Sequence, residues 1–232
     1  MRLERLREEV LEANLSLVRT GLVVDTFGNA SGIDRAEGLV VIKPSGVAYD
    51  KMTAADMVIT DLDGRTVEGS LRPSSDLATH LVLYRAFPAV GGVAHTHSRH
   101  ATAWAQAARE IPCFGTTHAD YFRGAVPVTA QLTPDEIGGD YEANTGQAIV
   151  RRLAGRDPAE FPAVLVRGHA PFCWGPSPAA ASRTAMLLEE IARLAWMTVT
   201  LSPGAEPIPD VLRDRHFLRK HGAQAYYGQQ SK

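Results

Sequence analysis

Hydrophobic residues repeat at helical spacing near the start of the chain, at Leu3, Leu6, Val10, Leu15 and Val18. This spacing predicts an amphipathic helix over residues 2–20, which Gly21 would end. Similar patterns predict helices over residues 77–87, from residue 98 onward, and over residues 144–153, 179–201 and 210–221.

Runs of apolar residues between these helices predict strands. The expected strands cover residues 39–42, 92–97 and 124–128, a hairpin of 57–60 with 66–68, and two strands within 163–174. Strands and helices mixed with hairpin signals are typical of an α/β fold with a largely antiparallel sheet flanked by helices. No repeat or linker divides the chain, so we expect one domain over residues 1–232.

Composition narrows the choice of function. The 232 residues carry a formal net charge of −2 and no basic block, which argues against a nucleic-acid partner. No apolar run approaches the roughly 18 residues of a membrane span, and the charged start Met1–Arg5 lacks the apolar region of a secretory signal. With only Cys113 and Cys173, a reduced cytoplasmic protein is the simplest expectation, although a disulfide is the alternative.

The segment Gly92–His97 carries the first candidate chemistry. It is an apolar strand that ends in His95 and His97. Residues i and i+2 of a strand point to one face, so both imidazoles can approach one divalent metal ion. A hydrogen-bonded histidine pair at a strand end is the alternative.

Two other segments can complete a metal site. His169 follows the apolar run Val164–Val166, and Asp76 lies at the head of the helix expected at residues 77–87. Three histidines and a carboxylate suit Zn²⁺ or a similar divalent ion.

Two small, polar loops have the composition of a phosphate site. They are Thr26–Gly32 and Lys43–Gly46, rich in backbone N–H groups and hydroxyls, with one lysine. Ordinary turn chemistry explains the same composition. Ser74 and Ser75 can cap the helix that follows or hold an anion at its N-terminus, and Ser98 is a candidate cap of the next helix.

The polar and aromatic run Gly115–Phe122 is expected to be a loop. Asp120 in this run is either an acid–base group or a turn residue. The last helix carries His216 and a basic cluster, which suits the negative end of a helix dipole. Tyr226 and Tyr227 follow, and we expect their rings to pack against another surface, such as that of a second subunit.

Taken together, these segments resemble the 4-epimerases of the class II aldolase/adducin superfamily. The resemblance runs nearly end to end and rests on six segments and His169, the first segment being Gly28-Asn29. The other five are Lys43-Pro-Ser-Gly46, Pro73-Ser-Ser-Asp76, His95-Thr-His-Ser98, Thr116-Thr-His-Ala-Asp-Tyr121 and the Tyr226-Tyr227 tail.

This resemblance implies an αβα sandwich, a homotetramer with active sites between subunits, and a phosphorylated pentulose as substrate. It implies Zn²⁺, with Mn²⁺ or another divalent ion as the alternative. The implied metal ligands are Asp76, His95, His97 and His169; the implied substrate site is Gly28, Asn29, Lys43, Ser45, Gly46, Ser74 and Ser75; the implied catalytic groups are Asp120, Tyr227 and His216.

The implied reaction interconverts L-ribulose 5-phosphate and D-xylulose 5-phosphate by cleaving and re-forming the C3–C4 bond, in L-arabinose catabolism. The alternatives are another pentulose-5-phosphate 4-epimerase and a sugar-phosphate aldolase of the L-fuculose type. In such an aldolase we expect Glu where this chain has Asp76. A non-catalytic adducin-like module would be expected to have lost the metal-binding histidines.

Overall fold

The computed structural model describes residues 2–227. Its centre is a seven-stranded sheet in the order β4-β3-β2-β1-β5-β7-β6, in which every neighbouring pair is antiparallel. The strands are β1 (Gly28–Asp34), β2 (Leu39–Ile42), β3 (Val58–Asp61), β4 (Thr66–Glu68), β5 (Gly92–Thr96), β6 (Ala163–Leu165) and β7 (Pro171–Gly175). The predicted antiparallel sheet is confirmed.

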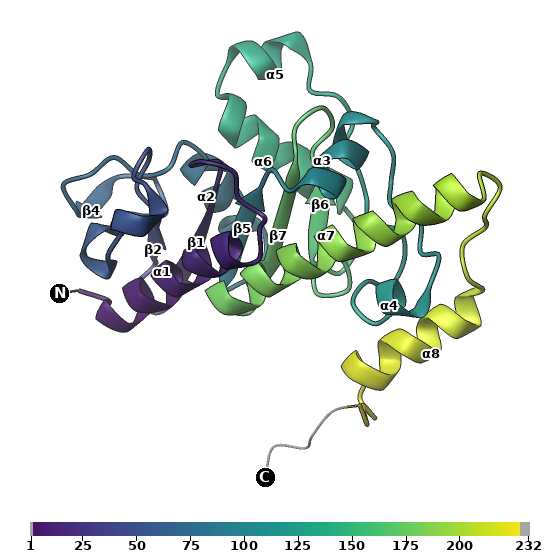
Figure 1. Ribbon diagram of the computed structural model, residues 1–232. Coiled ribbons are helices and arrows are strands. Elements are labelled where there is room, and N and C mark those ends of the chain that lie inside the picture. The colour runs from purple at the N-terminus through teal and green to yellow at the C-terminus, as the bar shows by residue number, and fades with distance from the viewer. Residues whose placement is uncertain (1, 228–232) are drawn as a thin grey trace.

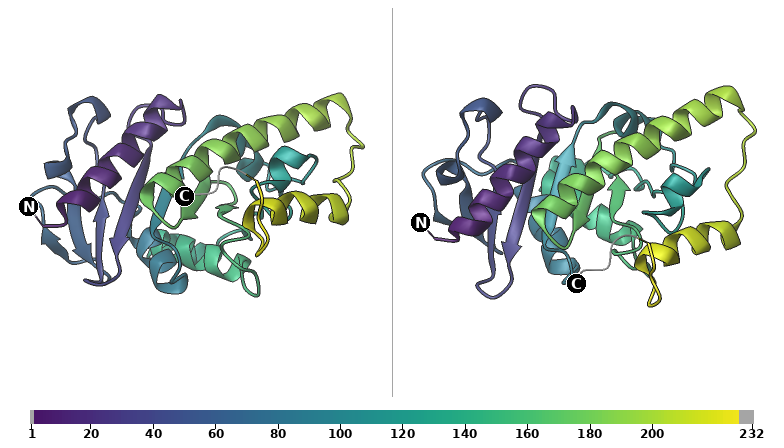
Figure 2. Two further views of the ribbon diagram at one scale, coloured as in Figure 1. Left: turned by 90° about the horizontal axis from the view of Figure 1, so that it is seen from below. Right: turned by 60° about the horizontal axis from the view of Figure 1, so that its bottom comes forward.

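Helices cover both faces of this sheet, which confirms the predicted αβα sandwich. One face carries α1, α3 and α7, with α1 and α7 side by side, and the other carries α2 and α6 (Figures 1 and 2). Helix α8 packs against the short helix α4. The helices are α1 (Glu4–Arg19), α2 (Leu77–Ala86), α3 (Arg99–Gln106), α4 (Thr116–Ala119), α5 (Pro134–Gly138), α6 (Tyr141–Arg152), α7 (Pro178–Leu201) and α8 (Asp210–His221).

The sheet is buried on both faces because its strands carry apolar residues in alternation. In β7, Phe172 and Trp174 pack toward α2 and α6, while Cys173 between them packs toward α7. Within residues 2–227, none of the helices is apolar enough over a sufficient length to cross a bilayer.

Strand β1 is the main element that the pattern did not predict, because Thr26–Gly32 was expected to be a loop. Its glycine, asparagine and serine residues have low strand propensity, yet β1 is a central strand between β2 and β5. Small residues are needed there. A Cβ on Gly32 would lie 2.7 Å from Pro178 Cγ and 2.8 Å from Leu6 Cδ1. The composition of β1 therefore reflects the close approach of α1 and α7 to the sheet.

Three smaller expectations were wrong. The run Gly115–Phe122 contains α4, and residues 124–128 form only isolated bridges instead of a strand. Neither Ser74 nor Ser75 is the cap of α2, because Asp76 occupies that position. Ser98 does occupy the cap position of α3, as predicted, but its side chain makes no capping hydrogen bond.

Gly92 at the start of β5 provides a test of this packing. A Cβ there would lie 2.4 Å from the carbonyl carbon and oxygen of Ser177, so Gly92→Ala must displace the start of α7. We expect it to lower the free energy of unfolding by about 3 kcal/mol in urea denaturation. Gly204→Ala is the matched control, since a Cβ there meets nothing within 4 Å, and should change it by less than about 0.5 kcal/mol. Equal effects of the two substitutions would contradict this packing.

Candidate metal centre and phosphate site

The antiparallel pairing of β5 with β7 brings three histidines together. His95 lies opposite Phe172 in this pairing, His97 follows the end of β5, and His169 lies in the turn just before β7. The candidate ligand atoms of the three all lie within 4.8 Å of one another. The predicted placement of His95 and His97 on one face is therefore confirmed, and His169 joins them.

The orientation of His95 leaves a nitrogen free for a metal ion. Its Nδ1 lies 2.9 Å from the carbonyl oxygen of Pro171, which can only accept, so Nδ1 carries the hydrogen. Its Nε2 then has a lone pair and faces His97 Nε2 at 3.2 Å. The His95 ring is also stacked on Phe172, with ring centroids 4.2 Å apart, which limits its rotation.

Burial keeps this site in the form that binds cations. Burial and the neighbouring His95 lower the pKa of His97, and burial lowers the pKa of His169 to about 4. Both imidazoles are therefore neutral at pH 7 and retain lone pairs. The buried Nδ1 of His169 also has no hydrogen-bond partner among the described residues. Three imidazoles that converge in this way fit a divalent cation of the zinc type.

Asp76 lies beside the three histidines. Its Oδ2 accepts a 2.6 Å hydrogen bond from Asn29 Nδ2. Burial raises the pKa of Asp76, but the electrostatic effect of the neighbouring His95 and His80 and the Asn29 hydrogen bond outweigh this and hold it below its usual range. Within residues 2–227, the group of candidate ligand atoms that lie within 4.8 Å of one another contains the three histidines but not Asp76. The role of Asp76 as a fourth ligand therefore stays a prediction.

The two predicted phosphate segments lie together. The N–H of Ser74 donates to the carbonyl of Lys43 at 2.9 Å, and that of Ser45 donates to the carbonyl of Arg72, also at 2.9 Å. The hydrogen bond from Asn29 to Asp76 connects these two segments to the start of β1. Gly28 there has φ +128°, and a Cβ would lie 3.1 Å from His95 O. The candidate substrate residues thus form one surface next to the histidines.

Lys43 is the cation of this surface. It is only 2% exposed, and its Nζ donates to Pro44 O at 3.2 Å and lies 4.8 Å from the Tyr49 ring centroid. Burial lowers its pKa. No carboxylate among the described residues forms an ion pair with it. A buried ammonium without a carboxylate partner is suited to an anionic ligand such as a phosphate.

A second cluster surrounds Asp120. Its Oδ1 accepts hydrogen bonds from His216 Nδ1 at 3.0 Å and from Arg219 Nη2 at 2.9 Å, and Lys220 Nζ lies 3.3 Å from Oδ2. Burial raises the pKa of Asp120, but these donors outweigh it and hold the pKa below its usual range. The Tyr227 ring lies against the same cations, 4.7 Å from Arg219 Cζ and 4.4 Å from Lys220 Nζ.

The helix-dipole interpretation of the basic residues in α8 missed this cluster. His216, Arg219 and Lys220 are spaced i, i+3 and i+4, so they share one face of the helix. That spacing was the available signal for a shared anionic partner.

The two clusters lie at opposite ends of the sheet within one chain. The histidines are at the end of β5, whereas Tyr121 and His221 line a cavity of about 700 Å³ with Phe87 and Gly175, beyond the start of β5. No hydrogen bond or ion pair joins the two clusters in the part of the chain that the structure describes. The chain alone does not bring the predicted catalytic groups to the histidines.

Comparison with known proteins identifies the family. The model described as "Class II Aldolase and Adducin N-terminal domain" matches residues 8–196. This chain belongs to that family. Class II aldolases depend on a divalent metal ion, and the His95, His97 and His169 cluster can bind one.

Curated relatives and solved structures agree with this class II aldolase assignment. L-ribulose-5-phosphate 4-epimerase UlaF from Salmonella paratyphi A (strain ATCC 9150 / SARB42) is 53% identical over 98% of this chain and 100% of its own length, and so is the protein of that name from Salmonella typhi. A solved L-fuculose 1-phosphate aldolase is 24% identical with a TM-score of 0.78, covering 91% of this chain and 94% of its own. The enzyme of that name from Thermus thermophilus is 25% identical with a TM-score of 0.67, and the match covers 87% of this chain and 98% of that enzyme.

Buried histidines make the stability of the metal-free protein depend on pH. Burial lowers the pKa of His118 to about 4 and that of His80 to about 3. The unfolded chain, with histidine pKa values near 6.5, binds more protons below that pH. The free energy of unfolding is therefore highest above about pH 6.5 and falls as the pH approaches 4. Each such histidine lowers it by about 2 kcal/mol between pH 6.5 and 5.

Urea unfolding of the metal-free protein at several pH values measures this loss. In the His118→Asn variant, the fall in the free energy of unfolding between pH 6.5 and 5 should be smaller by about 2 kcal/mol, the contribution of that one histidine. A wild-type free energy of unfolding that does not change between about pH 6.5 and 5 would show that these histidines are not held neutral by burial.

Proposed function

We propose that the protein is an L-ribulose-5-phosphate 4-epimerase that uses Zn²⁺, with Mn²⁺ or another divalent ion as an alternative. The observation that carries this proposal is the 53% identity, over 98% of the chain, to a protein of that name. The site supports it, because a metal centre lies beside a surface suited to a phosphate.

The substrate is proposed to bind across the two parts of this surface. Lys43, with the hydroxyl groups of Ser45, Ser74 and Ser75, would hold the 5-phosphate. Gly28, where a Cβ would lie 3.1 Å from His95 O, lets β1 approach β5 closely and so places Asn29 opposite His95. The buried Oδ1 of Asn29 has no partner within residues 2–227 and can accept from a sugar hydroxyl. His95, His97 and His169, with Asp76, would hold the metal ion.

In the reaction, a base removes the proton of the C4 hydroxyl, and the C3–C4 bond breaks into an enediolate and glycolaldehyde phosphate. The bound divalent cation would supply Lewis-acid stabilisation of the charge that develops on the C2 and C3 oxygens. The phosphate contacts keep the aldehyde fragment in the site while it rotates, and bond formation on its other face inverts C4. Inversion requires proton exchange on both faces, which we assign to Asp120 and Tyr227 as a pair, with His216 hydrogen-bonded to Asp120.

We further propose a homotetramer with each active site between two subunits. Asp120 and Tyr227 are at the end of the sheet away from the histidines, so a second copy would have to bring them to the metal centre. Large exposed apolar residues on α7 and α8 provide surface for such association. They are Met186, Leu194, Trp196, Met197, Leu201, Val211, Leu212 and Leu218.

The cytoplasm is the proposed location, since the buried thiols of Cys113 and Cys173 are unpaired and would stay reduced there.

The first test is conversion of L-ribulose 5-phosphate to D-xylulose 5-phosphate. We expect turnover by the metal-loaded protein, loss of turnover after chelation, and recovery with Zn²⁺ or Mn²⁺. Metal content should be measured in each sample, so that loss of activity can be compared with loss of the ion. Cleavage of L-fuculose 1-phosphate without epimerisation would instead support the aldolase alternative.

A second test mixes two inactive variants. His97→Ala should lose the metal ion, and Asp120→Asn should keep it but lose at least about 100-fold in kcat. In mixed tetramers assembled at random from equal amounts, about a quarter of the sites receive an intact His97 from one subunit and an intact Asp120 from its neighbour. We therefore expect about a quarter of the wild-type activity. Sites made within one chain would give no recovery.

A further inference from the structure

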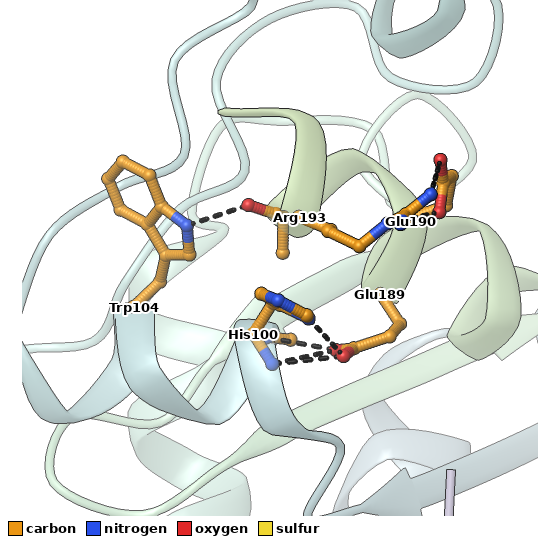
Figure 3. A network of polar contacts seen from close by, with 7 residues as sticks. His100, Trp104, Glu189, Glu190 and Arg193 are labelled. Atoms are coloured by element: carbon orange, nitrogen blue, oxygen red, sulfur yellow. Dashed lines mark hydrogen bonds and ion pairs between the residues drawn. The ribbon is translucent and has the colours of Figure 1, made fainter. Parts of the chain in front are cut away.

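Helix α3 begins directly after the histidine segment of β5, and its first N–H groups need acceptors. Ser98 does not supply one. The acceptor comes from another helix, because the carboxylate of Glu189 on α7 receives the N–H of His100 at 2.9 Å and that of Ala101 at 3.0 Å (Figure 3). It also lies 2.8 Å from His100 Nδ1.

A second contact joins the same two helices. The indole N–H of Trp104 on α3 donates to the carbonyl of Ala192 on α7 at 3.0 Å (Figure 3). Glu189 and Ala192 are three residues apart, so they lie on one face of α7. Helix α7 also packs on β5 and β7. It therefore holds α3 in a fixed position relative to the strands that precede and follow the histidines.

The other end of α3 touches the segment that carries the third histidine. The N–H of Gly168 donates to the carbonyl of Ala105 at 3.0 Å, and His169 is the next residue. At its N-terminal end, α3 is separated from His97 only by Ser98. The position of this one helix therefore affects both His97 and His169.

From these contacts we propose that Glu189 is a positioning residue for the metal centre. By holding the N-terminus of α3, it maintains the spacing of His97 and His169 that a divalent cation requires. This inference rests on the proposed metal-dependent function. Burial raises the pKa of Glu189, but the N–H groups of His100 and Ala101 outweigh burial and hold it below its usual range. The carboxylate is thus negative where the helix N-terminus is positive.

The neighbouring residue provides a matched control. Glu190 follows Glu189 on α7, but its carboxylate hydrogen-bonds to Arg193 one turn further along α7, at 2.9 Å and 3.0 Å, with both side chains about half exposed (Figure 3). Glu190→Ala removes the same charge from the same helix without changing the contact to α3.

The experiment measures Co²⁺ affinity of the purified full-length protein by competition with a chelator, with the Co²⁺ absorption spectrum as a second readout. We expect Glu189→Ala to bind Co²⁺ about tenfold more weakly and to show an altered spectrum, because partners behind a ligand affect metal affinity by 10–100-fold. Glu190→Ala should match the wild type in both. Glu189→Gln retains a carbonyl acceptor, so its loss should be smaller, about threefold.

Each outcome decides the proposal. Wild-type affinity and spectrum in Glu189→Ala would overturn it, even if thermal stability falls, because the contact would then be purely structural. If Glu189→Ala does not fold, Glu189→Gln decides, and wild-type Co²⁺ binding in that variant overturns the inference. Failure of the wild type to bind Co²⁺ would instead remove the proposed metal centre itself.

Discussion

The antiparallel pairing of β5 with β7 is the contact on which the site depends. It places the end of one strand beside the start of the other, so that two histidines close in sequence meet a third from 72 residues further along. Three imidazoles so close together cannot all be protonated, because each charge disfavours the next and burial disfavours all of them. The fold thereby lowers the pKa of His97 and His169, which keeps them in the form that a metal ion binds.

Residue spacing in the sequence was sufficient to predict the features that depend on local geometry alone. The period-two spacing of His95 and His97 predicts their common face, and the apolar repeat of residues 179–201 predicts α7 to within one residue. Spacing was insufficient to predict the features that depend on contacts with distant parts of the chain. The composition of β1 indicates a loop until the close approach of α1 and α7 is known. Ser98 occupies the cap position of α3, but the acceptor for the helix N–H groups is Glu189 from α7.

The acid–base groups show a related limit. Asp120 was open to two interpretations because nothing near it in sequence distinguishes a turn residue from a functional carboxylate. Its partners come from α8, almost a hundred residues away, and they make it a buried, multiply hydrogen-bonded anion. A buried carboxylate with this many charged donors has a lowered pKa and is held in its ionised form. That environment is a property of the folded chain and could not be found from the local sequence.

The outer strands of the sheet have a consequence for self-association. Both β4 and β6 are only three residues long, and the free side of β6 is already occupied, since Leu165 exchanges hydrogen bonds with Pro127 and Thr129 in the segment that was expected to form a strand of its own. Short or covered edges offer few unpaired backbone groups to another sheet. Copies of this chain are thus protected against edge-to-edge aggregation and are left with helical faces through which to associate.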